Sequence, residues 1–189
     1  PVLSAGVGEQ LAVPVGSAVT LLPAAWPTPS RPFRAVAPIK LGWPDTEKAK
    51  TLVEAGLKYI DTRLRAPDGG FVHTIHADGR AIDEHQNLYD HAFIVLAGTV
   101  AFDAINSDLA LKLADDALSF INDTLKDEVN GGWFESSERE TPRRANPHMH
   151  LLEAMMVYHD ATGCEKALAR AAECVRLFET RFFNPANNI

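Results

Sequence analysis

The sequence predicts an all-α fold in which amphipathic and apolar helices alternate, and three observations lead to this prediction. From Asp45 onward, apolar residues recur at helical spacing in five segments. Two of these segments are apolar around their whole circumference, which is typical of helices enclosed by other helices. Two long connections carry glycine pairs, at 69–70 and 131–132. Together these features indicate a repeated two-helix unit, of the kind that builds solenoids or closed double rings.

The first part of the chain differs in composition from the rest. Residues 1–44 contain eight of the twelve prolines, one acidic residue (Glu9) and no histidine. Proline interrupts helices, and no long amphipathic period runs through this segment. We therefore expect an irregular N-terminal segment over residues 1–40 and a helical domain over residues 41–189.

Five helices are expected in chain order. Residues 45–64, 108–125 and 165–183 have the amphipathic pattern of outer helices, whereas residues 88–105 and 147–161 are apolar nearly all round. Apolar inner helices favour a closed ring, because a solenoid encloses no helix so fully. A ring of about six such pairs would need roughly 350 residues at 1.5 Å per helical residue. The chain is thus expected to form a partial barrel of about five helices.

Charge and cysteine content limit the partners and the compartment. The net charge is −7 and the chain has no run of Lys or Arg, which argues against nucleic acid or an anionic membrane as a partner. Cys164 and Cys174 lie ten residues apart in one predicted helix, about 15 Å along its axis, too far for a disulfide. The apolar N-terminal stretch is interrupted by proline and follows no basic segment. We expect a soluble, cytoplasmic protein that acts on a small molecule.

The segment RANPHMHLLEA, residues 144–154, places polar groups in the second inner helix. Asn146, followed by proline, predicts the helix start, so that Asn146, His150 and Glu153 share one edge of the helix and His148 points elsewhere. His150 and Glu153 form either a buried structural pair or part of a site. Their place in the first two turns, beside a long glycine loop, favours a pocket.

The first inner helix begins with similar groups, and both glycine loops lead to the same end. The segment LYDHAF places Tyr89, Asp90 and His91 in its first turn. The loops bring aromatic and arginine side chains to this rim, which suits a sugar. These side chains are Phe71, Trp133, Phe134, Arg143 and Arg144.

The loop between residues 67 and 87 holds three more histidines. His73 and His76 are three residues apart in a glycine-bounded loop, which is weak spacing for a metal site. We expect solvent-exposed loop histidines here, and we predict no metal site.

Four motifs together resemble the N-acylglucosamine 2-epimerase family, in particular its bacterial mannose isomerase and mannose-6-phosphate isomerase-like members. The motifs lie in the same order over roughly residues 41–185, and the asparagine-to-HLLEA segment is the most specific of them. They are PDGGF (67–71), LYDHAF (88–93), NGGWFES (130–136) and RANPHMHLLEA (144–154).

The resemblance implies an (α/α)6 toroid that binds a sugar at one mouth and transfers protons beside a carbonyl carbon by histidine acid–base catalysis, with no cofactor. Histidine suits this task because its ordinary pKa of about 6.5 lies near working pH. Matched by motif, His150 would be catalytic and Glu153 would orient it. Asn146, Tyr89 and Arg144 would bind the substrate.

The expected activity is aldose–ketose interconversion of mannose-type sugars through an enediol. The family's two principal catalytic histidines belong to the second half of the barrel, so the activity is expected to be incomplete in this chain. Two alternatives stay open: an N-acylhexosamine or cellobiose 2-epimerase, and a non-catalytic carbohydrate-binding or interaction module. A partial ring would also expose the flanks of its inner helices, which predicts self-association.

Overall fold

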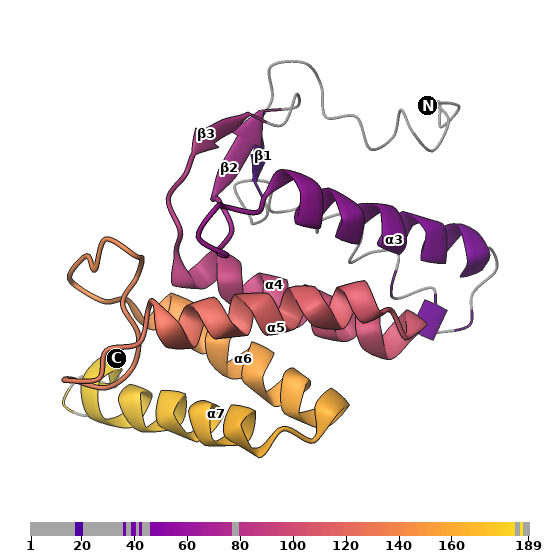
Figure 1. Ribbon diagram of the computed structural model, residues 1–189. Coiled ribbons are helices and arrows are strands. Elements are labelled where there is room, and N and C mark those ends of the chain that lie inside the picture. Colours follow the sequence, from indigo (N-terminus) through magenta and orange to yellow (C-terminus); the bar gives the residue numbers. More distant parts are fainter. Residues whose placement is uncertain are drawn as a thin grey trace.

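The computed structural model consists mainly of α-helices, with one small sheet (Figure 1). It describes residues 18–20, 36, 39, 40, 42, 46–76, 80–183 and 186. The helices of this part are α3 (Thr46–Arg63), α4 (Leu88–Ile105), α5 (Asp108–Asp123), α6 (Ala145–Thr162) and α7 (Glu165–Leu177), which a π-helical turn, η1 (Phe178–Phe182), extends. The strands are β1 (Ala18–Thr20), β2 (Thr74–His76) and β3 (Ala81–Asp83).

The predicted alternation of inner and outer helices is confirmed. Helices α4 and α6 pack side by side, α5 covers α4, and α7 covers α6, while α3 lies against α4 and α5. Helices α4 and α6 begin at the same end of the molecule, which is the left-hand end in Figure 1. Polar residues in their first turns are therefore brought to one end.

Helix α4 has the predicted bounds because local signals fix both of its ends. The side chain of Asn87 caps the start by accepting a hydrogen bond from the Asp90 N–H, and Asn106 ends the helix in the left-handed conformation at φ 52°. Among the described helices, α4 alone is long and apolar enough to cross a membrane. Its packing against α5 and α6 also accounts for this apolar composition, because a helix in the core of a soluble protein is as apolar as a membrane-spanning helix.

Helix α6 begins one residue before the predicted cap, so the prediction that Asn146 is the N-cap is wrong. The cap residue is Arg144, whose own side chain makes no capping hydrogen bond. Instead, the Glu135 carboxylate accepts hydrogen bonds from the backbone N–H and from Nε of Arg144. A loop residue therefore fixes the helix start, and Asn146 lies exposed in the first turn.

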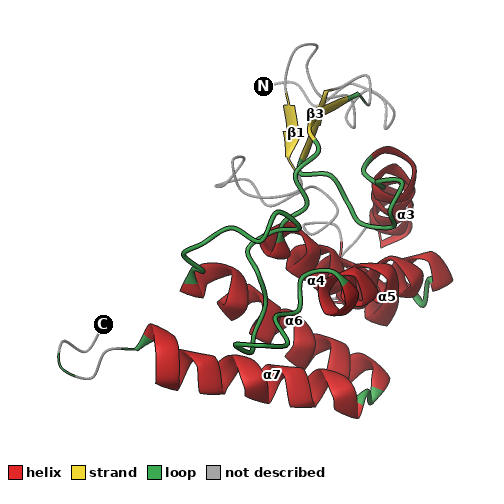
Figure 2. Cartoon of the chain, turned by 60° about the vertical axis from the view of Figure 1, so that its left-hand side comes forward, coloured by secondary structure: helices red, strands yellow, loops and turns green. Residues whose placement is uncertain are grey.

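The loop predicted between residues 67 and 87 contains two short strands that the sequence did not predict, β2 and β3, which pair antiparallel. Strand β1 adds to β2, with Ala18 opposite His76, and Figure 2 shows this sheet beside the helices. Asp78-Gly79, between the short segments TIH and AID, is the sequence signal for a hairpin. Strand β1 also departs from the irregular segment expected over residues 1–40; most of that segment lies outside the described residues.

Two buried imidazoles connect the glycine loops to the inner helices. The Phe71 N–H donates to His91 Nε2 at 3.1 Å, and the Trp133 N–H donates to His148 Nε2 at 3.3 Å. Each Nδ1 lies within 2.9 Å of the backbone carbonyl four residues earlier. A ring nitrogen that accepts must be unprotonated, so both rings are neutral with the proton on Nδ1. The same contact, from a loop N–H to a buried imidazole, thus occurs once in each repeat.

The second glycine of each pair is required by close packing. A Cβ at Gly70 would lie 2.7 Å from a ring carbon of Phe120, and one at Gly132 would lie 2.7 Å from a methyl carbon of Leu177. Gly132 also has a φ of +72°. Both loops therefore lie close to an outer helix, where an added Cβ would require Phe120 or Leu177 to move.

We predict that acid weakens the fold through His91. Burial lowers the pKa of its imidazole from 6.5 to about 4, and burial also lowers the pKa of His148. The unfolded chain therefore takes up these protons at higher pH than the folded chain does. The free energy of unfolding is retained above pH 6.5 and falls as pH decreases toward 4, by up to about 3 kcal/mol from His91.

Urea unfolding midpoints at about pH 7.5 and about pH 5 measure this loss. The control is His91→Gln, whose amide oxygen accepts from the Phe71 N–H without titrating. We expect a smaller decrease for the variant, and equal decreases for both proteins would contradict the assignment to His91.

Candidate functional site

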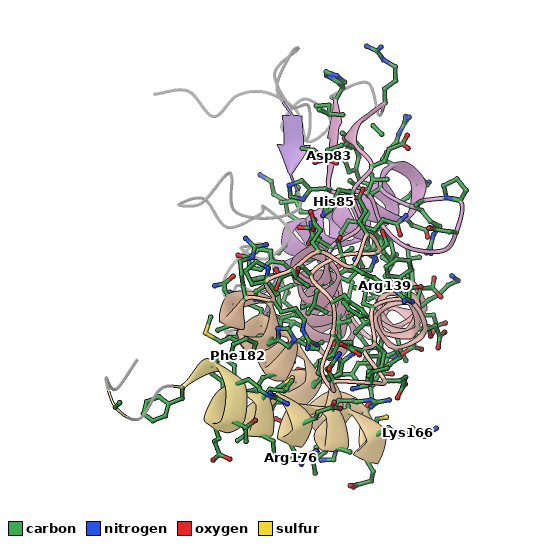
Figure 3. All side chains as sticks on the ribbon, turned by 90° about the vertical axis from the view of Figure 1, so that its left-hand side faces the viewer. Asp83, His85, Arg139, Lys166, Arg176 and Phe182 are labelled. Atoms are coloured by element: carbon green, nitrogen blue, oxygen red, sulfur yellow. The ribbon has the colours of Figure 1, made fainter. Side chains whose placement is uncertain are left out.

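The candidate site lies at the end where α4 and α6 begin. Figure 3 views the molecule from this end, with Asp83 and His85 labelled between the strands and the helices. The loops after α3 and α5 reach the same end, because each is bonded to the start of an inner helix through His91 or His148. The predicted site residues come from these two helix starts.

His150 lies in an aromatic cluster between the inner helices. Its ring meets Tyr89 edge to face at 5.1 Å between centroids and lies 4.6 Å from Phe93. Its Nδ1 is 3.1 Å from the Glu153 carboxylate. The side chain of His150 is 18% exposed, whereas that of Glu153 is 59% exposed. The predicted pair is present, and the alternative of a fully buried structural pair does not hold, because Glu153 lies on the uncovered side of α6.

The predicted substrate-binding residues lie around this cluster. Tyr89 stands in the first turn of α4, and burial together with the Asp90 charge raises the pKa of its phenol. The phenol is therefore a neutral hydrogen-bond donor at working pH. Asn146 is exposed on the first turn of α6. The Arg144 side chain is 72% exposed and is held by the buried Glu135 at 2.8 Å.

A second histidine–carboxylate pair, which the sequence did not predict, joins the loop residue His73 to Asp90 in the first turn of α4. His73 Nδ1 lies 2.5 Å from Asp90 Oδ2, and Asn87 Nδ2 donates to the same oxygen at 2.7 Å. Asp90 is fully buried and His73 is 34% exposed. The expectation of solvent-exposed loop histidines is therefore wrong for His73. The signal was an acidic residue three positions after the capping Asn87 in an otherwise apolar helix.

Two of the aromatics expected at the rim belong to the core. Phe71 and Trp133 are both completely buried, because their backbone bonds to the imidazoles draw them inward. Phe134 is half-buried, with the Arg143 guanidinium 5.8 Å from its ring centre. Arg143 also donates to the Gly131 carbonyl at 2.7 Å. Of the three aromatics, only Phe134 keeps an exposed face at this end of the described structure.

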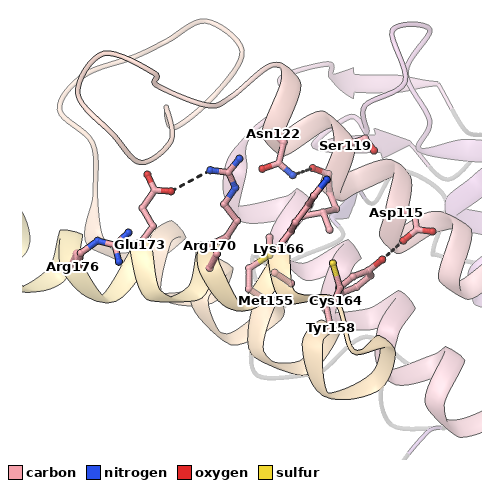
Figure 4. A pocket seen from close by; sticks show the side chains of 13 residues that line it. Asp115, Ser119, Asn122, Met155, Tyr158, Cys164, Lys166, Arg170, Glu173 and Arg176 are labelled. Carbon is pink, nitrogen blue, oxygen red and sulfur yellow. Dashed lines mark hydrogen bonds and ion pairs between the residues drawn. The ribbon is translucent and has the colours of Figure 1, made fainter.

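A groove of about 760 Å³ opens elsewhere, between α5, α6 and α7 (Figure 4). Helix α6 faces it with Met155 and Tyr158, on the side opposite to Asn146 and Glu153. The groove is therefore separate from the candidate site. Within residues 46–76 and 80–183, no group of three His, Cys, Asp or Glu side chains is arranged to hold a metal ion.

Comparison with known proteins relates the chain to sugar-converting enzymes. The sequence model of the N-acylglucosamine 2-epimerase (GlcNAc 2-epimerase) family matches residues 34–189. The chain is 31% identical to a D-mannose isomerase of Thermobifida fusca over 136 residues, which are 69% of this chain and 33% of that protein. It is 29% identical to a mannose-6-phosphate isomerase of Rhizobium meliloti, over 62% of this chain and 30% of that protein. The chain thus spans about a third of these relatives.

A solved structure with the same helix arrangement is the cellobiose 2-epimerase of Spirochaeta thermophila. Its TM-score is 0.71 at 21% identity, and the match covers 79% of this chain and 41% of that one. This likeness confirms the predicted fold class: the helices form part of an (α/α)6 toroid, to which the structure adds the small sheet.

Proposed function

Because the chain belongs to the N-acylglucosamine 2-epimerase family, we propose that it forms part of a sugar isomerase that acts on mannose-type aldoses. The named activities of the two relatives support this choice, since one is a D-mannose isomerase and the other a mannose-6-phosphate isomerase. The proposed reaction interconverts an aldose and a ketose.

The observation that carries the proposal is the setting of His150. The imidazole lies between the two inner helices at their first turns, against Tyr89 and Phe93, and remains partly open to solvent. Glu153 engages Nδ1, which fixes the ring and leaves Nε2 to meet a sugar oxygen. Histidine is the side chain most often used to accept and return protons in catalysis.

In the proposed reaction, a base removes the proton from C2 of the aldose while the carbonyl oxygen O1 gains a proton, and an enediol forms. A proton is then added at C1 while the O2 proton is lost, which gives the ketose. By resemblance to the family, the principal acid and base belong to a part of the barrel outside this chain. His150 would contact a substrate hydroxyl and assist the movement of its proton, with Glu153 as its orienting partner. Tyr89, Asn146 and Arg144 would bind other hydroxyls.

A 2-epimerase is the second candidate, because one solved structure with the same fold is a cellobiose 2-epimerase. It would share the enediol but return the proton to the opposite face of C2. The products separate the candidates: a ketose indicates the isomerase, and an aldose inverted at C2 indicates the epimerase. Binding of sugar without either product would indicate a non-catalytic module.

We predict that His150→Ala lowers kcat/KM for mannose-to-fructose conversion by at least ~10-fold in the protein as its gene encodes it, because a hydrogen bond to a reacting group is lost. The urea midpoint should change little. Glu153 is 59% exposed, so it remains hydrated when its partner is removed.

The matched control is His159→Ala in the last turn of the same helix, where His159 Nδ1 bonds the Cys164 carbonyl. His148 does not serve as a control, because it is buried and holds the second loop. We expect the control to retain turnover. A lower urea midpoint with full activity for His150→Ala would assign His150 a structural role alone.

We also propose that the chain self-associates through the uncovered face of α6. Met149 and Met156, two turns apart on this face, are 44% and 52% exposed. Sedimentation velocity over a range of concentrations should show a larger species. The double substitution Met149→Gln and Met156→Gln should shift it toward monomer, because apolar area is removed from the contact. A wild-type monomer at every concentration would contradict this.

A reducing, cytoplasmic location is also proposed. Cys164 and Cys174 are both free thiols, and Cys174 is buried. Such thiols persist where disulfides are kept reduced. Recovery of the protein from a secreted or membrane fraction would contradict this location.

A further inference from the structure

His73 and Asp90 form a tightly bonded pair at the start of α4. His73 Nδ1 lies 2.5 Å from Asp90 Oδ2. Asn87 binds Asp90 at two points, because its Nδ2 donates to Oδ2 at 2.7 Å and its Oδ1 accepts from the Asp90 N–H at 2.8 Å. The carboxylate therefore has one orientation, and it holds the imidazole in one orientation as well.

The burial of Asp90 is costly in a way that the fold alone does not explain. Its side chain is 0% exposed, and its second oxygen, Oδ1, has no hydrogen-bond partner among the described residues. A buried carboxylate that lacks bonds destabilises a protein unless a charged partner offsets the cost. His73 supplies that charge when it is protonated, and Asp90 raises the pKa of its imidazole. Such arrangements concentrate at functional sites.

The pair is linked to the cluster around His150 through Tyr89, the residue before Asp90 in the chain. Tyr89 precedes Asp90 in the first turn of α4, and the Tyr89 ring contacts His150 at 5.1 Å. Each inner helix thus begins with one histidine–carboxylate pair, His73–Asp90 on α4 and His150–Glu153 on α6. His73 is 34% exposed, so a ligand can reach its ring.

We propose that His73 is a second substrate-contacting imidazole of the sugar site, which donates a hydrogen bond from Nε2 to a substrate oxygen, and that Asp90 is its positioning residue. This inference rests on the proposed sugar isomerase function. With Nδ1 bonded to Asp90, Nε2 is the ring nitrogen that faces a ligand. Asp90 raises the pKa of the imidazole, which favours the protonated ring, in which Nε2–H is a charge-assisted donor.

The competing explanation is a purely structural clamp. In the second repeat, Glu135 lies two residues after the loop aromatic Trp133 and binds Arg144 at the start of α6. His73 has the same position after Phe71 and could hold the first loop in the same manner. A clamp would affect stability, whereas a substrate-contacting imidazole would affect turnover and its pH dependence.

The test compares His73→Gln, Asp90→Asn and the control His76→Gln in the protein as its gene encodes it. Gln at position 73 retains an N–H for Asp90, which favours correct folding. We expect His73→Gln to lower kcat/KM for mannose at least ~10-fold at pH near 7, with an unchanged urea midpoint. His76 lies three residues away on β2, and its replacement should leave both values unchanged.

The pH profile separates positioning from structure. Two carboxylates raise the pKa of His73, Asp90 on α4 and Asp83 on β3. If the protonated ring is the donor, activity falls as pH rises through that pKa. Asp90→Asn removes the larger contribution, so the alkaline fall should move to lower pH. A lower urea midpoint for His73→Gln, with unchanged kcat/KM and pH profile, would overturn the inference in favour of the clamp.

Nuclear magnetic resonance of ring-labelled histidine, with mannose as the probe, distinguishes failure of this inference from failure of the proposed function. Wild-type turnover with equal activity in His73→Gln and His76→Gln overturns the role of His73 alone. A mannose-dependent shift of the His73 ring without turnover supports that role and rejects the isomerase. If neither turnover nor a mannose-dependent shift of the His73 ring is observed, both the role of His73 and the isomerase function are rejected.

Discussion

One buried imidazole in each repeat holds a long loop to the start of an inner helix, and the candidate site depends on this contact. Each ring accepts the N–H of a loop aromatic at Nε2 and engages a helix carbonyl at Nδ1. A buried imidazole lacking either bond would cost about 1–3 kcal/mol. Because both bonds are made, the direction of the backbone after Phe71 and after Trp133 is fixed. His73 and Glu135, two residues later, therefore reach the helix starts.

Local signals explain which parts of the fold were predictable. The bounds of α4 follow from its apolar length and from the cap residues Asn87 and Asn106, which directly flank the helix. The start of α6 was missed by two residues because its cap depends on Glu135, nine residues before Arg144. The sheet was missed because strands of three residues are too short to show alternation.

The same distinction applies to the site. The His150–Glu153 pair was predictable because residues three apart on a helix are neighbours. The His73–Asp90 contact joins residues 17 apart through a loop whose path no periodicity specifies. Burial of Trp133 likewise depends on His148. From the sequence, His148 was predicted only to point away from the edge of the helix that holds His150 and Glu153. Loop side chains and the family resemblance predicted a sugar site, whereas tertiary contacts decide which side chains lie at the helix starts.

The order of helix packing has a consequence for how the chain folds. Helices α4 and α5 are consecutive, as are α6 and α7, so each pair makes contacts between residues close in sequence. Loop-closure entropy is small for such contacts, and we expect each hairpin to form early. The packing of α4 on α6 brings together helices separated by α5 and a long loop. Tyr89 and His150 meet only in that later step, so we expect the candidate site to assemble after the hairpins that carry it.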